Sequence, residues 1–545
     1  MKLKENSTNQ KLRGAYYTPK GLASAIVSLC SIPDNAKILE PSCGDGVFIE
    51  ALNEARMLNS GIILDAVEID SVALESARCL DMGMADCNFK NCDFFDFYEK
   101  SPKGIYNLIL GNPPYIRYQY LNAKQRSELS ELLESQGMRS NKLINAWVGF
   151  MVACTNLLRK DGTLAFVIPA ELLQVAYAKD LRRYLANHFE KITLLSFSNL
   201  VFDDIEQETV VFIGQKGENK CQIRIIESTD VAELSARNLD TIEYQPIMPT
   251  EEKWTRYFIS NNDSRVLNRL SKDTRLVPFS ELALINVGVT TGNNSYFSLT
   301  DNVADTYNLT EYTIPLIGRS SHASGVYFTA EDWTNNRLAG KKARLLTLSD
   351  GSYSMLDSKQ RQYIDEGALS GAGKGYKCSI RESWYSVPSI WIPDAFFLRR
   401  NNLYPKFVIN SCSAISTDTM HRMKLREDLD ARIALICYYN SISFAYTELC
   451  GRSYGGGVLE ILPNEVGAVL VLNPDYITLP EDIINSAVTL IDDTIRGNND
   501  IEIALDHIDK NILQDAFGFD SETCAACRRI WKTLQARRLG RGAKR

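Results

Sequence analysis

The residues best suited to chemistry form the run Gly111-Asn112-Pro113-Pro114-Tyr115, directly after the apolar segment 105–110. That segment predicts a buried strand, and two prolines must end it because proline fixes its own φ and restricts the residue before it. We therefore expect Asn112 and Tyr115 on a stiff loop at the carboxyl end of a strand, the edge at which open α/β sheets bind ligands.

The chemistry of this loop suits an exocyclic amino group. The Asn112 side-chain oxygen and the Pro113 carbonyl can accept both hydrogens of an –NH2 group, which leaves the nitrogen lone pair aimed outward for attack. Tyr115 offers a flat face on which a planar base can stack. The alternative for these residues alone is a simple proline turn with a buried aromatic ring.

A second turn, Glu40-Pro41-Ser42-Cys43-Gly44-Asp45-Gly46, joins a short strand to a helix and is expected to bring backbone N–H groups close to a ligand. It lacks the Lys-Ser/Thr pair of a triphosphate-binding loop. Its acidic residues would repel a pyrophosphate and suit a cationic or amino-bearing ligand. Cys43 and Cys92 are interpreted as packing residues, since no cysteine nucleophile is needed.

Acidic residues also end the next two strands. Glu68 stands where a carboxylate can accept hydrogen bonds from both hydroxyls of a ribose. Asp93 and Phe94 follow the third strand and can bond an adenine amino group and stack on its ring. Singly, such an acid is as well explained as a solvated cap, but in this order the residues describe a pocket for S-adenosylmethionine.

The elements that must position these residues alternate between strand and helix over about 20–215, which predicts an α/β fold with a doubly wound, mostly parallel sheet. After Gly217 the alternation is lost. We assign 1–215 to a catalytic domain, 216–255 to a linker, and 256–545 to a mixed α+β domain that ends in a helical basic tail.

Length and composition agree with a soluble protein of at least two domains. The chain has 545 residues, of which 45% are apolar and 23% charged. No apolar run approaches the length of a membrane span, and the first residues lack a signal-peptide core, so we expect a cytoplasmic protein whose thirteen cysteines are free thiols. Neither the lone Cys524-Ala-Ala-Cys527 nor the scattered histidines predict a metal site.

The net charge of −7 argues against a uniformly basic surface for nucleic acid but allows a local basic cleft. Basic residues do gather in places, and the tail from Cys527 to Arg545 contains eight Lys or Arg and no acid. That tail is explained equally by a solvated helix end and by contact with phosphates.

Together these motifs resemble the gamma class of DNA amino-methyltransferases, the TaqI-like adenine methyltransferases of restriction-modification systems. Gly14 to Pro19 matches the N-terminal cofactor motif of that family, Glu40 to Gly46 its glycine loop, and Asn112 to Tyr115 its catalytic loop. The resemblance implies cofactor-binding roles for Tyr16, Thr18, Pro19, Glu40, Pro41, Cys43, Gly44, Gly46, Glu68, Ile69, Asp93, Phe94, Asn112 and Pro114.

The resemblance further implies that Asn112, Pro113, Pro114, Tyr115 and Phe202 are the catalytic residues. The match of Phe202, which would pack the other face of the target base, is looser because Asp203 and Asp204 replace a more usual proline-containing turn. The segments 287–294, 416–419 and 448–457 resemble the target-recognition domain of the family. Candidate DNA contacts there are Lys374, Lys377, Arg399, Arg400, Arg452 and Tyr454, although for any one of them taken singly an ordinary surface residue is the favoured interpretation.

The function implied is methyl transfer from S-adenosyl-L-methionine to the N6 amino group of an adenine flipped out of duplex DNA. N4-cytosine methylation, methylation of a protein glutamine amide and a non-catalytic DNA-specificity subunit are the alternatives. No nuclease constellation of the acid–acid-x-Lys type is evident, which argues against a fused restriction enzyme. The expected partners are double-stranded DNA and a cognate restriction endonuclease, and we expect a monomer.

Overall fold

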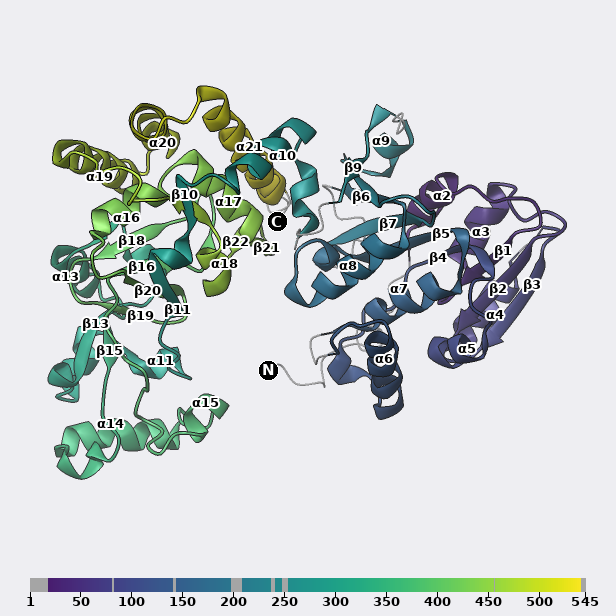
Figure 1. The fold of residues 1–545 in the computed structure, drawn as a ribbon. Coiled ribbons are helices and arrows are strands. Elements are labelled where there is room, and N and C mark those ends of the chain that lie inside the picture. The colour runs from purple at the N-terminus through teal and green to yellow at the C-terminus, as the bar shows by residue number, and fades with distance from the viewer. Residues whose placement is uncertain are drawn as a thin grey trace. The chain divides into compact units, whose positions relative to one another are not determined.

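The computed structural model describes residues 18–80, 83–140, 144–197, 208–236, 241–247, 253–454 and 456–540. The chain divides into two compact units, Met1–Phe258 and Ile259–Arg545 (Figure 1). Among the described residues, no helix is both long and apolar enough to cross a bilayer.

The first unit is built on one large sheet whose strand order is β3-β2-β1-β4-β5-β7-β6-β8-β9. Strands β3, β2, β1, β4 and β5 run parallel, and β7 is inserted antiparallel between β5 and β6. The strands are β1 (Lys37–Glu40), β2 (Ile63–Glu68), β3 (Asp86–Asn91), β4 (Tyr106–Gly111), β5 (Leu158–Pro169), β6 (Lys191–Phe197), β7 (Thr209–Gln215), β8 (Gln222–Ser228) and β9 (Gln245–Pro246).

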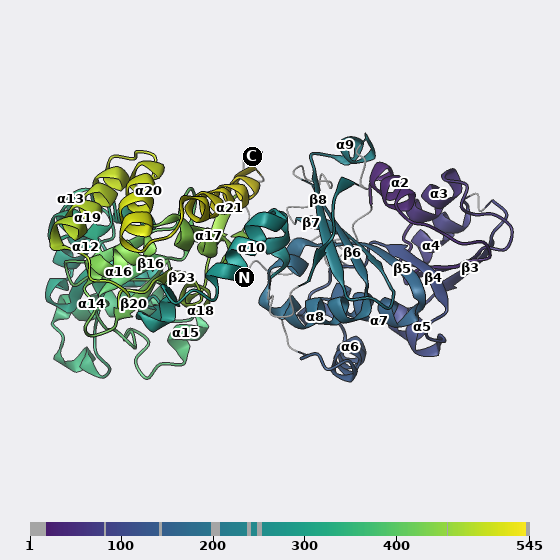
Figure 2. The ribbon, with the colours of Figure 1, turned by 45° about the horizontal axis from the view of Figure 1, so that its top comes forward.

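Helices cover both faces of this sheet (Figure 2). Side chains of α2, α3 and α4 fill one core, and those of α5, α6, α7 and α8 fill the other. The predicted doubly wound α/β fold is thereby confirmed. The helices are α2 (Lys20–Ser28), α3 (Val47–Glu54), α4 (Ser71–Arg78), α5 (Phe94–Lys100), α6 (Ala123–Ser135), α7 (Ala146–Leu157), α8 (Lys179–His188) and α9 (Val231–Ala236).

The range 216–255, expected to be a linker, contributes strands to the sheet of the first unit. β8 pairs in parallel with β6, and β9 pairs with β8. Ile223 and Ile226 of β8 are buried in the two cores, whereas Gln222 and Glu227 of the same strand are exposed. Because β8 combines buried apolar residues with exposed polar ones, its composition resembles that of a linker. The boundary between the units therefore falls after Phe258.

The second unit is mixed, with short sheets ordered β11-β20-β16-β18-β14, β12-β15-β13-β19, β17-β22-β21 and β10-β23. Its strands are β10 (Leu276–Pro278), β11 (Ala283–Val287), β12 (Ser298–Leu299), β13 (Thr313–Ile317), β14 (Tyr327–Phe328), β15 (Arg344–Leu346), β16 (Ala395–Leu398), β17 (Arg400–Asn401), β18 (Phe407–Asn410), β19 (Ile415–Ser416), β20 (Met420–Leu425), β21 (Arg452–Tyr454), β22 (Val458–Glu460) and β23 (Leu470–Leu472).

Helices pack around these sheets and form most of the C-terminal part. They are α10 (Asn261–Leu270), α11 (Asn294–Phe297), α12 (Asp301–Thr306), α13 (Ala330–Leu338), α14 (Ser358–Leu369), α15 (Tyr376–Ser379), α16 (Ala431–Tyr438), α17 (Ser441–Cys450), α18 (Pro463–Gly467), α19 (Glu481–Arg496), α20 (Glu502–Ile508) and α21 (Ser521–Gly540).

The basic tail is part of this unit's core. Trp531 of α21 is fully buried and meets Phe444 of α17 edge to face at 5.2 Å between ring centroids. Arg538 is buried as well and lies 2.7 Å from Glu448. In the described part of the tail, Arg538 stabilises the packing of α21 on α17. The arginine at this position is therefore not a solvated side chain at a helix end.

Candidate functional site

The candidate residues of the first unit meet at one edge of its sheet. The strand order runs β2-β1-β4, and these strands are parallel, so their carboxyl ends lie side by side. From β1 the chain adds β2 and β3 on one side, and it then adds β4 and β5 on the other side of β1. This reversal beside β1 is a topological switch point, where such sheets bind ligands. The glycine turn, Glu68 and the Asn112 loop therefore converge.

The loop after β4 is fixed at both ends. Gly111 adopts φ +152°, a conformation that residues with side chains rarely adopt. The Ser42 hydroxyl donates to the backbone carbonyl of Asn112 at 3.2 Å, so the glycine turn holds the start of the loop. At its far end, the Tyr115 hydroxyl donates to the carbonyl of Val167 in β5 at 3.1 Å. Asn112 is partly exposed between these anchors.

Tyr115 is more buried than its expected stacking role suggests. Its ring is only 8% exposed and belongs to the hydrophobic core on the α7 side of the sheet. Pro113 is also buried, whereas Pro114 is partly exposed. The loop is thus a rigid part of the sheet edge.

The glycine turn is attached to the end of β2. Gly44 N–H donates to Glu68 Oε2 at 2.9 Å, and Asp70 N–H donates to Glu68 Oε1 at 2.9 Å. Gly46 begins α3 with φ +92°, and a Cβ placed there would lie 2.6 Å from the Leu80 side chain. Glycine is required at this position by both backbone and space.

Glu40 is the most unusual acid of the site. Its side chain is 1% exposed, and within the described residues its Oε2 atom has no hydrogen-bond partner. Burial raises its pKa well above the ordinary value, and the nearby Glu68 and Asp45 carboxylates raise it further. A buried, unsatisfied carboxyl beside other acids suits a positively charged ligand, and a sulfonium or ammonium group would meet that need.

Cys43 lies in the same turn and is buried. Its thiol is buried, and burial together with the charges of Glu40 and Glu68 raises its pKa. A thiol held protonated in this way is unreactive, which agrees with its interpretation as a packing residue.

Asp93 and Phe94 begin α5 at the end of β3. One oxygen of Asp93 accepts from Phe95 N–H at 2.8 Å and caps the helix. The other accepts from the side-chain amide of Gln125 in α6 at 2.8 Å. Phe94 is buried and stacks on Phe150 with 4.4 Å between ring centroids.

Gln125 is a site residue that the sequence interpretation missed. The local signal was the spacing Asn122-x-x-Gln125, which forms a capping box at the start of α6. That spacing predicts the helix start but not the contact with Asp93, which lies 32 residues earlier in the chain.

The remaining cofactor candidates are placed less centrally. Thr18 is buried and Pro19 is exposed at the start of α2, while Ile69 is exposed next to Glu68. Tyr16 and Phe202 lie outside the described residues. No group of His, Cys, Asp or Glu side chains in the described ranges has the geometry of a metal site.

Three of the candidate DNA contacts converge on one buried carboxylate. Arg399, Arg400 and Arg452 lie 3.1, 3.4 and 3.3 Å from the oxygens of Glu460 in β22. They form an ion-pair cluster on the β17-β22-β21 sheet and are not separate surface charges. Lys374 and Lys377 are exposed beside α15, and the side chain of Tyr454 lies outside what the structure describes.

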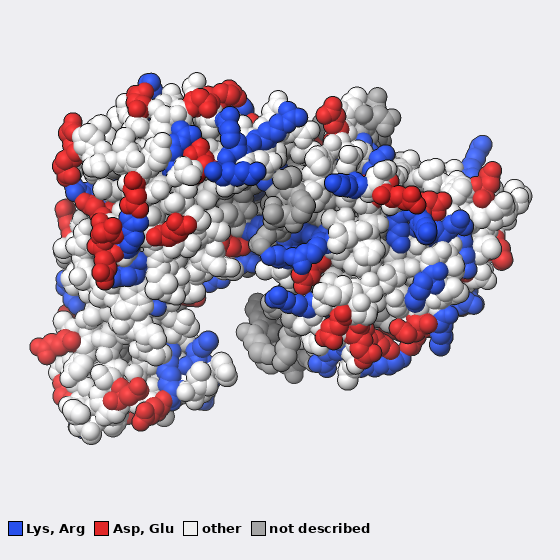
Figure 3. Space-filling model, viewed as in Figure 1, with Lys and Arg blue, Asp and Glu red and all other residues white. Residues whose placement is uncertain are grey.

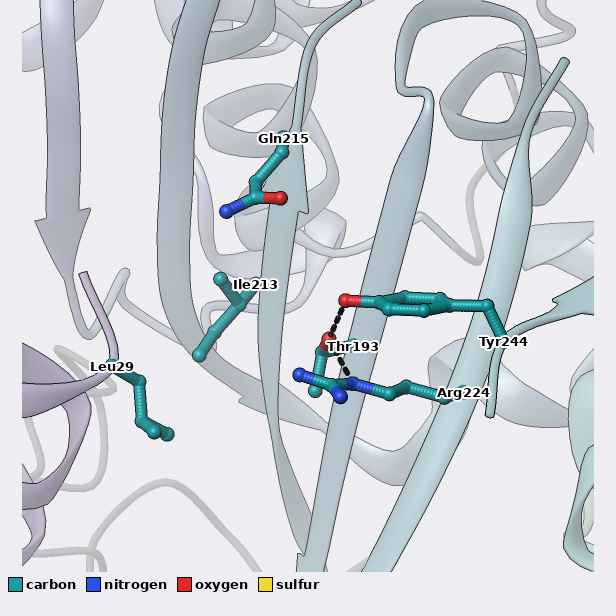
Figure 4. A pocket seen from close by; sticks show the side chains of 6 residues that line it. All are labelled: Leu29, Thr193, Ile213, Gln215, Arg224 and Tyr244. Carbon is teal, nitrogen blue, oxygen red and sulfur yellow. Dashed lines mark hydrogen bonds between the residues drawn. The ribbon is translucent and has the colours of Figure 1, made fainter. Parts of the chain in front are cut away.

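A shallow pocket of the first unit lies at the opposite edge of the sheet (Figure 4). Arg224 and Tyr244 both bind the hydroxyl of Thr193, at 3.0 and 2.9 Å. Gln215 ends the antiparallel β7 and pairs with Lys191 at the start of β6, so the pocket faces the amino ends of the parallel strands. It is separate from the Asn112 loop.

Comparison with known proteins identifies two family models in the chain. Residues 78–202 match the Eco57I restriction-modification methylase, and residues 251–513 match the C-terminal domain of the type II methyltransferase M.Eco57I. The type II methyltransferase M.AccI of Acinetobacter calcoaceticus is 23% identical over 493 residues, which cover 85% of this chain and 86% of that protein.

Two further proteins are similar over different extents. The type II methyltransferase M.HincII of Haemophilus influenzae is 28% identical over 246 residues, 44% of this chain and 45% of its own. The solved structure of the type IIL restriction-modification enzyme MmeI in complex with DNA aligns with a TM-score of 0.59 at 12% identity. That alignment covers 95% of this chain and 75% of MmeI, and at such low identity it shows a shared fold.

Proposed function

We propose that the chain, which is similar to type II restriction-modification methyltransferases, transfers a methyl group to the N6 amino group of an adenine flipped out of duplex DNA. Its cofactor is S-adenosyl-L-methionine. The observation that supports this proposal best is the rigid Asn112-Pro113-Pro114-Tyr115 loop, held by Ser42 of the glycine turn at the carboxyl end of β4.

The residues of the first unit would hold the cofactor as follows. Glu40 supplies a buried carboxyl for a cationic group, and Glu68, already oriented by two backbone N–H donors, can accept from ribose hydroxyls. Asp93 would bond the adenine amino group, and Phe94 would pack against the adenine ring. The cofactor supplies an electrophilic methyl group carried on a sulfonium.

The loop acts by orienting the amino group of the target base. Asn112 Oδ1 and the Pro113 carbonyl accept the two N6 hydrogens, which directs the nitrogen lone pair outward, and Tyr115 with Phe202 hold the base. The N6 proton leaves after the N–C bond forms, so no strong base is required. The rate gain then comes from positioning and from fixed dipoles.

We further propose that the protein acts as a monomer in the cytoplasm, with double-stranded DNA as its substrate and a cognate restriction endonuclease as its functional counterpart. Methylation at a shared site would protect host DNA from that nuclease.

The deciding experiment is methyl transfer from labelled S-adenosylmethionine to unmethylated duplex DNA, followed by nucleoside analysis. We expect N6-methyladenine at one short recurring sequence. Detection of N4-methylcytosine instead would show that cytosine, and not adenine, is the target base. Tight cofactor binding with no label on DNA would contradict the proposed substrate.

Asn112→Ala tests the loop directly. Loss of one of the two acceptors for the amino group should lower the turnover number by roughly a hundredfold or more, because the lone pair is no longer held in line. DNA affinity should stay within a few fold. Asn59→Ala, at the exposed turn before β2, is the matched control and should keep full activity. Near-normal turnover in Asn112→Ala would remove this residue from the mechanism.

A further inference from the structure

The second unit displays two large apolar side chains next to cations. Tyr376 is 74% exposed and Ile380 is 62% exposed, on and just after the short helix α15. Lys374 and Lys377 belong to the same segment and are exposed as well. We call these four side chains the 374–380 face. Neighbouring exposed apolar residues with a basic rim are typical of an interaction site.

The backbone that carries this face is held firmly by the other side of the same segment. Cys378 is fully buried, and its thiol donates to the carbonyl of Thr291 at 3.6 Å. The Arg381 guanidinium donates to the carbonyls of Thr290 at 3.0 Å and Thr291 at 2.8 Å. The exposure of Tyr376 and Ile380 is therefore a consequence of a fixed conformation.

Glycines make this close attachment feasible. Gly292 has φ +82°, and a Cβ there would lie 2.7 Å from the Cys378 sulfur. Gly373 would place a Cβ 2.7 Å from the indole of Trp384. Because both positions exclude a side chain, the segment can lie directly on the loop that follows Gly288 and on the Trp384 ring.

The charge of the face is not neutralised within the second unit. Over the described residues, neither Lys374 nor Lys377 lies in an ion pair, whereas the three arginines around Glu460 share a carboxylate. Residues 374–382 contain three cations and one acid, Glu382. Figure 3 shows Lys and Arg atoms gathered beside α15.

We propose that the 374–380 face enters a groove of duplex DNA, with Lys374 and Lys377 on phosphates and with Tyr376 and Ile380 against the bases. The inference rests on the proposed function and assigns to this surface a part of target binding. Lysine–phosphate contacts release counterions and supply affinity, and apolar side chains placed against or between base pairs are a recurrent device of groove-binding proteins. A rigid carrier suits this use because little conformational entropy is lost on binding.

The test measures binding of the full-length protein to a mixed-sequence duplex by fluorescence anisotropy across a salt series. The double variant Lys374→Ala/Lys377→Ala should reduce the slope of log Kd against log[salt] by about 2, since two phosphate contacts are removed. Tyr376→Ala should weaken binding about tenfold at a fixed salt concentration, and Tyr376→Phe should restore most of the affinity because the ring is retained.

Controls separate a local effect from general damage. Lys510→Ala removes an exposed lysine that pairs with Asp515 in the same unit and should leave the slope unchanged. All variants should bind S-adenosylmethionine and melt as the parent does, because the changed side chains are exposed.

The outcomes distinguish the inference from the function on which it rests. A parent protein that binds cofactor but not duplex DNA contradicts the proposed function. A parent that binds and methylates DNA, with a double lysine variant that is indistinguishable from it, overturns the inference alone and favours a protein partner for this face. A lysine effect without a Tyr376→Ala effect overturns the contact with bases.

Discussion

At the scale of single residues, the acids of the proposed cofactor site differ in whether their oxygens have hydrogen-bond partners. Both oxygens of Glu68 accept backbone N–H groups, whereas Glu40 keeps a buried oxygen without a partner among the described residues. A buried carboxyl of this kind costs stability and is retained where a ligand compensates for it. Glu40 is thus the residue at which stability and cofactor binding should conflict.

We predict that Glu40→Gln stabilises the cofactor-free protein at neutral pH and weakens cofactor binding. The folded state holds the Glu40 proton to a higher pH than the unfolded state does, because burial raises the pKa. The free energy of unfolding therefore falls as the pH rises above the unfolded value of about 4.3, by up to about 1.4 kcal/mol per pH unit until the raised pKa is reached.

Glutamine has no such proton. The difference in the free energy of unfolding between Glu40→Gln and the parent should therefore grow with pH over that interval. Urea denaturation at a series of pH values measures it. Calorimetry in two buffers of different ionisation enthalpy should show proton release on cofactor binding to the parent and none to Glu40→Gln. Equal pH dependence in the two proteins would mean that Glu40 does not titrate in this way.

At the scale of elements, α6 contacts the proposed cofactor site because its first turn binds the start of α5. Gln125 donates to Asp93, and Lys124 pairs with Asp96 one turn later. The Gln125 contact is partly buried, whereas Lys124 is largely exposed. The first contact should fix the orientation of the Asp93 carboxylate, and the second should contribute little.

We expect Gln125→Ala to weaken S-adenosylmethionine binding about fivefold, the worth of one hydrogen bond that orients an acceptor. Lys124→Ala on the same helix is the control and should bind the cofactor as the parent does. Titration calorimetry provides both values. Tighter binding in Gln125→Ala would show instead that Gln125 competes with the cofactor for Asp93.

The sequence predicts the parts of the site that depend on local backbone geometry. Prolines ended β4, glycines marked the turn before α3, and acids stood at the ends of β2 and β3, so residue types alone place these residues at the carboxyl ends of their strands. The contact of Gln125 with Asp93 and the sharing of Glu460 by three arginines join distant segments, and no local pattern encodes them. Strand β8 was missed because its mixed apolar and polar composition resembles that of a linker.

The segments of the second unit that resemble a family pattern gain a physical explanation from the structure. A Cβ at Gly288 would lie 1.9 Å from the carbonyl oxygen of Thr417, and Asn294 donates to Asp418 at 3.1 Å. Segments 287–294 and 416–419 are therefore two sides of one close contact. Their residue types reflect packing as well as any role in recognising DNA.

At the scale of the whole molecule, the two units have separate cores, and the C-terminal helix completes the core of the second. Arg538 and Glu448 are both buried, and Arg538 also donates to the carbonyl of Asn402 at 2.7 Å. Breaking a buried ion pair by removing one partner leaves an uncompensated charge. We therefore expect α21 to depend strongly on this single side chain.

Arg538→Ala should destabilise the second unit by about 3–5 kcal/mol and leave the first unit unchanged. Urea denaturation should then show two transitions, of which only the one belonging to the first unit moves to higher urea with saturating S-adenosylmethionine, because a ligand stabilises only the unit that binds it. Arg529→Ala, which removes an exposed arginine from Asp263 and Glu522, is the control and should shift neither transition appreciably. If Arg538→Ala lowers both transitions equally, the two units unfold together and the division of the chain into independent parts is wrong.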